Sequence, residues 1–423
     1  MSDSRQVSSE GFLRSGFVYI FLSFFTSIFE VGFNWVTVRL PGDGYATVWA
    51  LFRLFFIVTA PITAFQLVVG KEIAAYTVLG QYGKRRVFLE RTLVFTVAVA
   101  CAVTISGLAF SGNIASFLRI ESGLPVMLLF TSVLAYSPIP ALFGAIQGLK
   151  KFYKLAFMQM SWGGLRLVFG AVALFMLSGG LDLFMVFIAA ATALTMALAW
   201  LPNRAIFAHG REPVGKSELM HAYGLVVPVI LTLFSVTVMK NADVVFAKNL
   251  FAAGQAEAYT CAALVGSGFF IISGIFMVMF PAVSEENVRS GNPIVFLLKS
   301  CAFVAVFSAA GIAVAVMAPK LPMYIITFGK RVPGAEPLIR LIGFAVVPLA
   351  LVNVMSNYLL AKHQWRFIPV LAGGMLLQII FILVAGGSPR SMLLGIIAAN
   401  TLTLTGMTAF VIHDHRKSTA GGA

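Results

Sequence analysis

Long apolar stretches recur along the whole chain and limit what it can fold into. A helix needs about 20 apolar residues to cross the hydrocarbon core of a bilayer. Stretches of about that length or more lie at roughly 13–38, 44–70, 88–111, 123–148, 153–178, 182–207, 219–247, 254–283, 293–317, 336–360, 366–386 and 389–412. The chain is 59% hydrophobic and 11% charged over 423 residues, too little polar surface for a soluble protein of this length. The sequence therefore predicts an all-α, polytopic membrane protein of about twelve transmembrane helices.

The connections between these stretches indicate the orientation of the chain. Short cytoplasmic loops collect lysine and arginine. If the N-terminus is inside, the connections near 71–91, 150–154 and 204–216 hold an excess of basic residues over the opposite side. We therefore expect both termini in the cytoplasm. The first apolar stretch is too long for a signal peptide, and the broken stretch from Pro319 to Pro337 is expected to hold a short re-entrant or surface segment.

The net charge of +14 is spread over short loop flanks, which argues against a nucleic-acid partner and for attraction to anionic membrane lipids. The histidines and the three cysteines show no spacing typical of a metal site, so we expect neither metal nor cofactor. A phosphate-binding loop of the ATPase type is missing from the sequence, and the connections are too short for an extramembrane catalytic domain. The protein is not expected to be an enzyme.

The clearest change of composition inside the chain is the polar connection around residues 208–218. It predicts two lobes, 1–208 and 209–423, each with six helices. An even number of helices makes both halves enter the membrane from the same side. The sequence thus favours a parallel repeat about an axis along the membrane normal, with a substrate site between the halves.

Two arginines, Arg53 and Arg166, fall near the middle of apolar stretches. A charge at this depth is costly unless it faces a partner or a wet cavity, so such a residue is a candidate for function. Glu30 is predicted at a depth similar to that of Arg53, and a buried ion pair between them is as compatible with the sequence as substrate contact. Arg166 has no acidic partner of matching depth that the sequence reveals, which favours a place in the cavity wall.

Other polar groups in the apolar stretches complete the set of candidates. Lys240 and Asp243 lie three residues apart, on one face of a helix, and could form an ordinary salt bridge. Several amide side chains within the apolar stretches could hydrogen-bond sugar hydroxyls, although bonds between helices are the more frequent use of such residues. They are Asn34, Gln66, Gln159, Asn353, Asn357, Gln378 and Asn400. We predict Arg53, Arg166, Lys240, Asn241, Asn34 and Asn357 as cavity residues, and Glu30 and Asp243 as candidates for ion coupling.

The segment from Asn241 onward carries a recognisable pattern. It reads Asn-Ala-Asp-Val-Val-Phe, followed by Ala256-Glu257-Ala258-Tyr259 and by Phe280-Pro281-Ala282-Val283-Ser284-Glu285-Glu286. This pattern resembles the Wzx-type polysaccharide flippases of the multidrug/oligosaccharidyl-lipid/polysaccharide (MOP) exporter superfamily. In that family an aspartate opens helix seven, a tyrosine follows near the start of helix eight, and a proline stands near its end.

The resemblance implies a V-shaped pair of six-helix lobes in a bacterial inner membrane. Such a protein moves a polyprenyl-pyrophosphate-linked saccharide from the inner to the outer leaflet by alternating access, and a polysaccharide polymerase or glycosyltransferases are candidate partners. Basic residues often line the cavity in this group, which would map onto Arg53 and Arg166, and the helix-seven aspartate onto Asp243. The chain is short for the family and lacks the two further helices usual in lipid II flippases.

Three other functions remain open from the sequence. A drug or organic-cation antiporter of the same superfamily would need an acidic and aromatic cleft. A membrane-embedded transferase would need a sizeable external loop, which this chain lacks. A non-transporting component of a polysaccharide machine is the third alternative.

Overall fold

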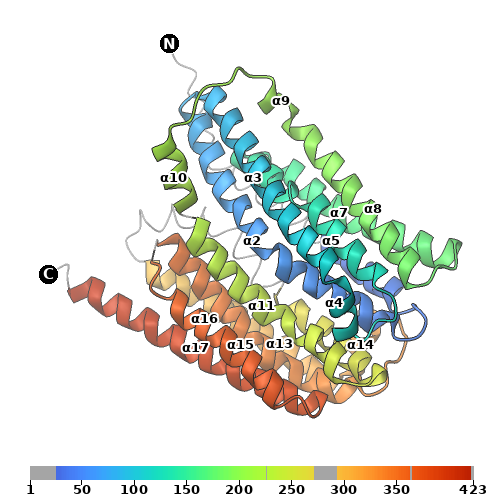
Figure 1. The fold of residues 1–423 in the computed structure, drawn as a ribbon. Helices are drawn as coiled ribbons and strands as arrows, with labels where there is room; N and C mark the ends of the chain where they lie inside the picture. The colour runs from blue at the N-terminus through green and yellow to red at the C-terminus, as the bar shows by residue number, and fades with distance from the viewer. Residues whose placement is uncertain (1–24, 225, 271–292, 363, 421–423) are drawn as a thin grey trace. The chain divides into compact units, whose positions relative to one another are not determined.

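The structure is a computed structural model that describes residues 25–224, 226–270, 293–362 and 364–420 (Figure 1). All regular structure in these residues is helical, which confirms the predicted all-α membrane fold. The chain divides into two compact units, and each is described by itself.

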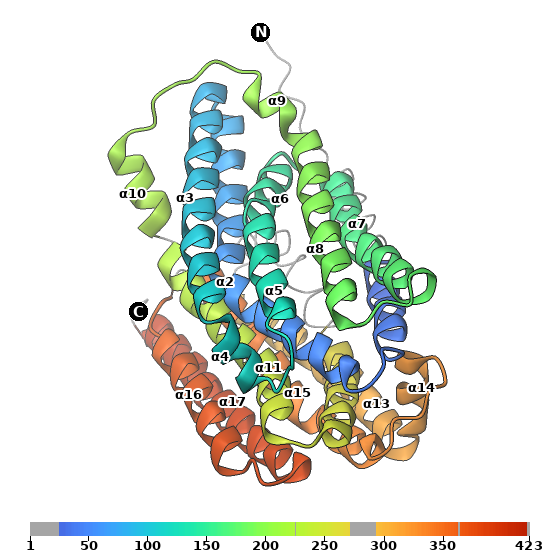
Figure 2. The same ribbon diagram turned by 45° about the vertical axis from the view of Figure 1, so that its right-hand side comes forward.

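The N-terminal unit comprises residues 1–40, 58–116 and 120–227. A helix over residues 25–37 begins its described part. The helices that follow are the second part of α2 (Gly44–Val78), α3 (Tyr82–Ala109), α4 (Ser111–Phe117), α5 (Leu124–Tyr136), α6 (Ile139–Gly148), α7 (Phe152–Ala171), α8 (Leu181–Trp200), α9 (Arg204–Phe207) and α10 (Lys216–Gly224). In Figure 2, α5, α7 and α8 lie side by side, and both α5 and α7 pack against α8.

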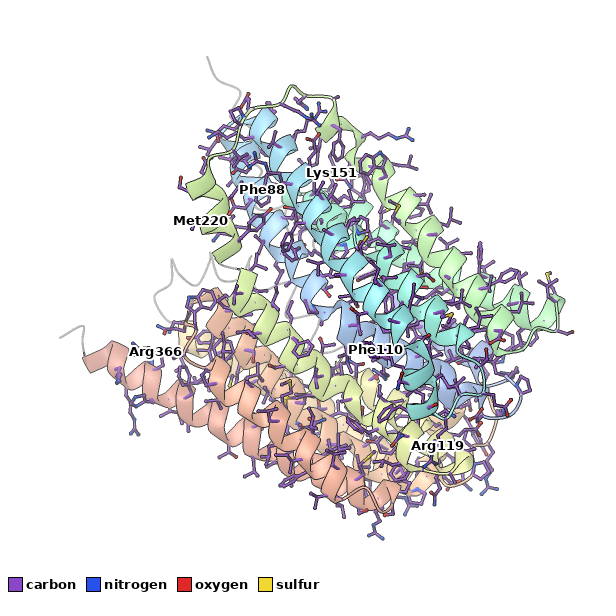
Figure 3. All side chains as sticks on the ribbon, viewed as in Figure 1. Phe88, Phe110, Arg119, Lys151, Met220 and Arg366 are labelled. Atoms are coloured by element: carbon purple, nitrogen blue, oxygen red, sulfur yellow. The ribbon has the colours of Figure 1, made fainter. Side chains whose placement is uncertain are left out.

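The C-terminal unit comprises residues 41–57, 117–119 and 228–423. A helix over residues 253–270 is described as far as Phe270. The other helices are α11 (Val226–Leu250), α13 (Pro293–Met317), α14 (Lys320–Thr327), α15 (Ala335–Ala361), α16 (Ile368–Val384) and α17 (Pro389–Ala420). α15 packs against α13 and α17, and α16 against α17. In Figure 3, Arg119 and Arg366 mark opposite ends of this unit.

The division into units cuts through α2. Residues 41–57 pack with the C-terminal unit, whereas residues from Val58 onward pack with the N-terminal unit. The expected lobes, 1–208 and 209–423, stay a prediction. A hydropathy plot could not have shown that α2 packs with both units. A helix that changes its packing partner keeps the same apolar composition along its length.

Most of the predicted spans reappear as helices. Among the described residues, nine helices are long and apolar enough to cross a membrane, and α16 is a shorter apolar helix. The predicted spans 13–38 and 254–283 lie partly outside the described residues, and the motif from Phe280 to Glu286 lies wholly outside them. The stretch between Pro319 and Pro337 holds a short helix, α14, as expected.

Proline interrupts one of the predicted spans. The expected span 123–148 is found as one candidate membrane span, Leu124–Gly148, in which α5 and α6 meet at Ser137 and Pro138. Proline lacks the amide hydrogen that would continue the helix, and its ring crowds the preceding turn. By contrast, Pro61 and Pro348 lie inside the continuous helices α2 and α15.

Glycines allow a close helix crossing in the N-terminal unit. A Cβ at Gly144 of α6 would lie 2.4 Å from the backbone oxygen of Gln66 in α2, and one at Gly148 would lie 2.5 Å from that of Gly70. Real Cβ atoms do not approach a carbonyl oxygen this closely. The glycines therefore let the two backbones touch, as small residues do at helix interfaces in membranes.

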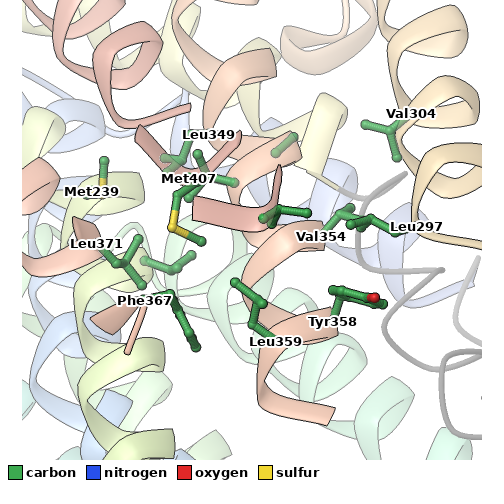
Figure 4. Close-up of a cluster of buried hydrophobic side chains, with 14 of the residues drawn as sticks. Met239, Leu297, Val304, Leu349, Val354, Tyr358, Leu359, Phe367, Leu371 and Met407 are labelled. Atoms are coloured by element: carbon green, nitrogen blue, oxygen red, sulfur yellow. The ribbon is translucent and has the colours of Figure 1, made fainter. Parts of the chain in front are cut away.

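The core of the C-terminal unit is built from long side chains of several helices. Figure 4 shows this cluster, in which Leu349, Tyr358 and Leu359 of α15 meet Met407 of α17 and Leu371 of α16. Met239 of α11 belongs to the same cluster and is 2% exposed. The next residue along α11, Lys240, begins a polar region.

Candidate functional site

A buried guanidinium group organises the polar region of the C-terminal unit. Arg53 of α2 is 4% exposed. Its Nη1 donates to Oδ1 of Asn241 at 2.8 Å, and its Nη2 donates to Oγ of Ser267 at 2.8 Å. Its guanidinium carbon also lies 5.8 Å from the centre of the Trp49 ring. Arg53 thus joins the first part of α2 to α11 and to the helix over residues 253–270.

An acidic side chain lies close to this arginine. Asp243, on the same helix as Asn241, is 8% exposed and interacts electrostatically with Arg53. Its Oδ2 accepts a hydrogen bond from the Tyr259 hydroxyl at 3.0 Å. Its Oδ1 has no hydrogen-bond partner among the described residues. One carboxylate oxygen is therefore held in place, while the other can accept a proton or a donor.

A small cavity opens beside Asp243. It has a volume of about 20 Å³, and its polar wall is formed by Lys240, Asp243, Ser267 and Asn400. Within the described part of the chain, Oδ1 of Asn400 also lacks a hydrogen-bond partner. A cavity of this size holds roughly one water molecule, and these polar groups could bind it.

Lys240 supplies a second positive charge to the same region. Its Nζ lies 4.6 Å from the centre of the Phe270 ring, which is a favourable cation–π distance. Arg53, Lys240, Asn241 and Asp243, four of the predicted site residues, are therefore grouped in one buried polar cluster, which we call the Arg53 cluster.

A second buried arginine lies in the N-terminal unit. Arg166 of α7 is 1% exposed, and its Nη2 forms a salt bridge with Oε1 of Glu30. Its guanidinium carbon lies 4.1 Å from the centre of the Trp162 ring and 5.3 Å from that of Phe33. The positive charge is thus covered by two aromatic rings and bound by a carboxylate.

This arrangement corrects the sequence prediction for two residues. Arg166 was expected to lack an acidic partner, and Glu30 was considered a partner for Arg53. Glu30 pairs with Arg166 instead, because its helix packs against α7: a Cβ at Gly32 would lie 2.9 Å from Cδ2 of Leu167. Depth in the membrane could not separate the two arginines, since both were predicted near the midplane.

The remaining predicted residues have different surroundings. Asn34 is 3% exposed and belongs to the N-terminal unit, whereas the Arg53 cluster belongs to the C-terminal unit. Asn357 donates from Nδ2 to the backbone oxygen of Asn353 at 2.9 Å, which is a bond within α15. Lys248, on the same helix as the Arg53 cluster residues Lys240, Asn241 and Asp243, is 4% exposed and pairs with Asp43.

Sequence reasoning missed Ser267, which lies in an apolar run where a single serine carries no positional signal. Asn400 is one of the amides considered for sugar binding but is not among the predicted cavity residues, and Tyr259 is identified only through the family resemblance. Across the described residues, no three side chains of His, Cys, Asp or Glu gather as a metal site would require.

Comparison with known proteins places the fold. No protein-family model matches the chain, and no curated protein matches it either. Several solved structures are similar to this chain. The inward-facing conformation of a multidrug resistance MATE family transporter of the MOP superfamily aligns with a TM-score of 0.73 at 13% identity, over 94% of this chain and 95% of that one. The chain has the same fold as this MATE transporter.

Two further structures support this assignment of the fold. The outward-facing conformation of a multidrug resistance MATE family transporter aligns with a TM-score of 0.69 at 13% identity, over 96% of this chain and 95% of that one. A MOP superfamily transporter from Pyrococcus furiosus aligns with a TM-score of 0.56 at 11% identity, over 95% of each chain. At identities of 11–13%, these likenesses show the fold alone.

Proposed function

We propose that the protein is a flippase of the MOP superfamily that carries a polyprenyl-pyrophosphate-linked oligosaccharide from the inner to the outer leaflet of the membrane. The similar structures include inward-facing and outward-facing conformations, and from them we infer alternating access for this chain. The substrate class is inferred from the charges in the Arg53 cluster.

The observation that carries the proposal is the surplus of positive charge in that cluster. Counted over the described residues, Arg53 and Lys240 are its cationic members and Asp243 its acidic one, so the cluster has one more positive than negative side chain. Such a surplus in a low-dielectric region favours an anion. Charge-assisted hydrogen bonds from a guanidinium suit a phosphate group well, because two parallel N–H groups match two of its oxygens.

In this proposal the residues have separate tasks. Arg53, Lys240 and Asn241 bind the anionic headgroup, while Asp243 takes up the coupling proton or cation through its second carboxylate oxygen. Arg166 is held by Glu30 and stabilises the packing of the N-terminal unit. The Pyrococcus transporter is described as having a binding pocket of reverse polarity that suggests a different function, which supports the idea that this fold serves substrates of more than one charge.

The test uses a deletion strain complemented with variants. If the protein is a flippase, deletion causes lipid-linked saccharide to accumulate in the inner leaflet, and wild-type protein restores the distribution. We expect Arg53→Gln and Lys240→Gln, at normal protein levels, to fail to restore it. Arg204→Gln, which changes an exposed arginine of α9, serves as the matched control. Unchanged lipid pools in the deletion strain would contradict the proposal.

A drug or organic-cation antiporter is the second candidate. It is favoured by the multidrug resistance transporters among the similar structures and by the buried carboxylate of Asp243. It predicts that deletion changes tolerance to cationic drugs and leaves the lipid-linked saccharides unchanged. It also predicts that Asp243→Asn abolishes the activity, whereas Arg53→Gln, if it folds, retains cation transport.

A further inference from the structure

An open pocket of about 540 Å³ lies at one end of the C-terminal unit, outside the Arg53 cluster. Its wall includes Arg331, Arg340 and Arg390, together with Glu336. Arg331 lies in the connection between α14 and α15, Arg340 in α15, and Arg390 in the first turn of α17. We call this cavity the three-arginine pocket. It falls within the ordinary size range of ligand sites, roughly 300–1,000 Å³.

The charges in this pocket favour an anion. Three arginines and one glutamate give a surplus of two positive charges. Glu336 pairs with Arg331 at 3.6 Å, and the Arg331 side chain is 69% exposed. Arg340 and Arg390 are exposed as well, and no salt bridge joins either of them to an acid in the described part of the chain. Their guanidinium groups are therefore available to a ligand.

The N-terminal ends of two helices, α15 and α17, add to the positive electrostatic potential in the pocket. α15 begins at Ala335 after Gly334, whose φ of 80° is a left-handed conformation that suits glycine, and no side chain caps this end by a hydrogen bond. α17 begins at Pro389, beside Arg390. The N-terminal end of a helix carries a partial positive charge that attracts anions. Two such ends border the three-arginine pocket.

The neighbouring helix α14 indicates where the ligand comes from. Its exposed side chains include Leu321, Tyr324 and Ile325, at 52%, 39% and 57%, whereas Met323 and Thr327 are fully buried. Phe328, directly after the helix, is 58% exposed. A short helix with an outward apolar face beside basic residues is typical of the membrane interface. In Figures 1 and 2, α14 and the turn between α16 and α17 both lie at the end of this unit away from the C-terminus.

From this combination we propose that the three-arginine pocket binds the phosphate of an anionic phospholipid headgroup. α14 would bury its apolar side chains among the acyl chains, and Arg340 and Arg390 would donate to the phosphate oxygens. The chemistry is shared with free inorganic phosphate, but the exposed apolar face of α14 favours a phosphate that is attached to a lipid. This site does not depend on which substrate the protein transports.

Purified full-length protein in detergent can be tested with short-chain phosphatidylglycerol, with phosphatidylcholine of the same chain length and with inorganic phosphate. Bound lipid is counted by native mass spectrometry, and the dissociation constant is followed by titration. We expect phosphatidylglycerol to bind about tenfold more tightly than phosphatidylcholine, and the double variant Arg340→Gln/Arg390→Gln to lose that preference. Arg204→Gln, a matched exposed arginine in the other unit, should keep it.

Three results would overturn the proposal: equal binding of both lipids by wild type, an unchanged preference in the double variant, or displacement of phosphatidylglycerol by an equal concentration of inorganic phosphate. If the double variant does not fold, Glu336→Gln provides the test. Because it removes the negative charge from the pocket, it should tighten phosphatidylglycerol binding. Weaker or unchanged binding would count against the site.

Discussion

Nη1 of Arg53 donates a hydrogen bond to Oδ1 of Asn241, 188 positions further along the chain, at 2.8 Å. The bond joins α2 to α11 inside the C-terminal unit. Both side chains are almost fully buried, at 4% and 3% exposed. Because water cannot replace a lost partner at this depth, the contact should be measurable as stability.

Arg53→Lys should lower the stability of the protein. A lysine keeps the positive charge but cannot reach Asn241 and Ser267 with two fixed donors, so one buried acceptor loses its bond at a cost of about 2 kcal/mol. Thermal unfolding of the purified protein in detergent measures the loss. Asn113→Ala, at an exposed position of α4, is the control. A melting temperature equal to that of wild type would show that the two hydrogen bonds contribute little.

Glu30→Gln should destabilise the N-terminal unit by about 2 kcal/mol, because Arg166 loses a charged hydrogen-bond partner. Thermal unfolding is again the measurement. Glu121→Gln changes an exposed glutamate for which no salt bridge occurs among the described contacts, and should have no effect.

Replacing both partners distinguishes a structural pair from a transport residue. Glu30→Leu with Arg166→Met removes both charges and leaves apolar side chains of similar length. Such an exchange is often neutral when an ion pair contains a buried group, as Arg166 is here. We expect the double variant to melt close to wild type and to keep the lipid-linked saccharide distribution. If the double variant melts like wild type but does not restore the lipid-linked saccharide distribution, Arg166 has a role in transport and not only in packing.

Gly144→Ala should disrupt the crossing of α2 and α6. The added Cβ would lie 2.4 Å from a carbonyl oxygen, so the helices must separate. Overpacking of this kind costs about 1–3 kcal/mol. The matched control is Gly373→Ala in α16, where nothing lies within 4 Å of the added atom. Equal melting of the two variants would contradict the close crossing.

The predicted orientation can be tested with single cysteines in a variant that lacks Cys101, Cys261 and Cys301. A cysteine at Gly387, an exposed residue between α16 and α17, should react with an impermeant maleimide in intact cells. A cysteine at Gly210, in the connection predicted to be cytoplasmic, should react only after the membrane is opened. The reverse pattern would place both termini outside.

Hydropathy was enough to predict the helical membrane fold, since burial in lipid requires long apolar runs. The ranges 293–317 and 336–360 nearly coincide with α13 and α15. The interruption of the apolar pattern after Pro319 also indicated the position of α14. The break between α5 and α6 at Pro138 was not among the predictions.

The partners of buried charges could not be read from the sequence in the same way. The sequence predicts how deep in the membrane a charged residue lies. A salt bridge also depends on which helices are neighbours and which faces they turn to each other. Arg53 and Arg166 have similar predicted depths, yet Glu30 pairs with Arg166 because α7 and the helix over residues 25–37 pack together. The family pattern located Asp243 and Tyr259, whose hydrogen bond the structure shows.

Residues 41–57 pack with the C-terminal unit, and this has a consequence for attempts to produce the two halves separately. A gene fragment that starts at residue 209 would encode α11 without Arg53 and Asp43, the partners of Asn241 and Lys248. Such a fragment would leave an ammonium group and an amide uncompensated in an apolar environment. Producing residues 41–57 together with this fragment should therefore raise its yield, because these residues return Arg53 and Asp43 to their partners.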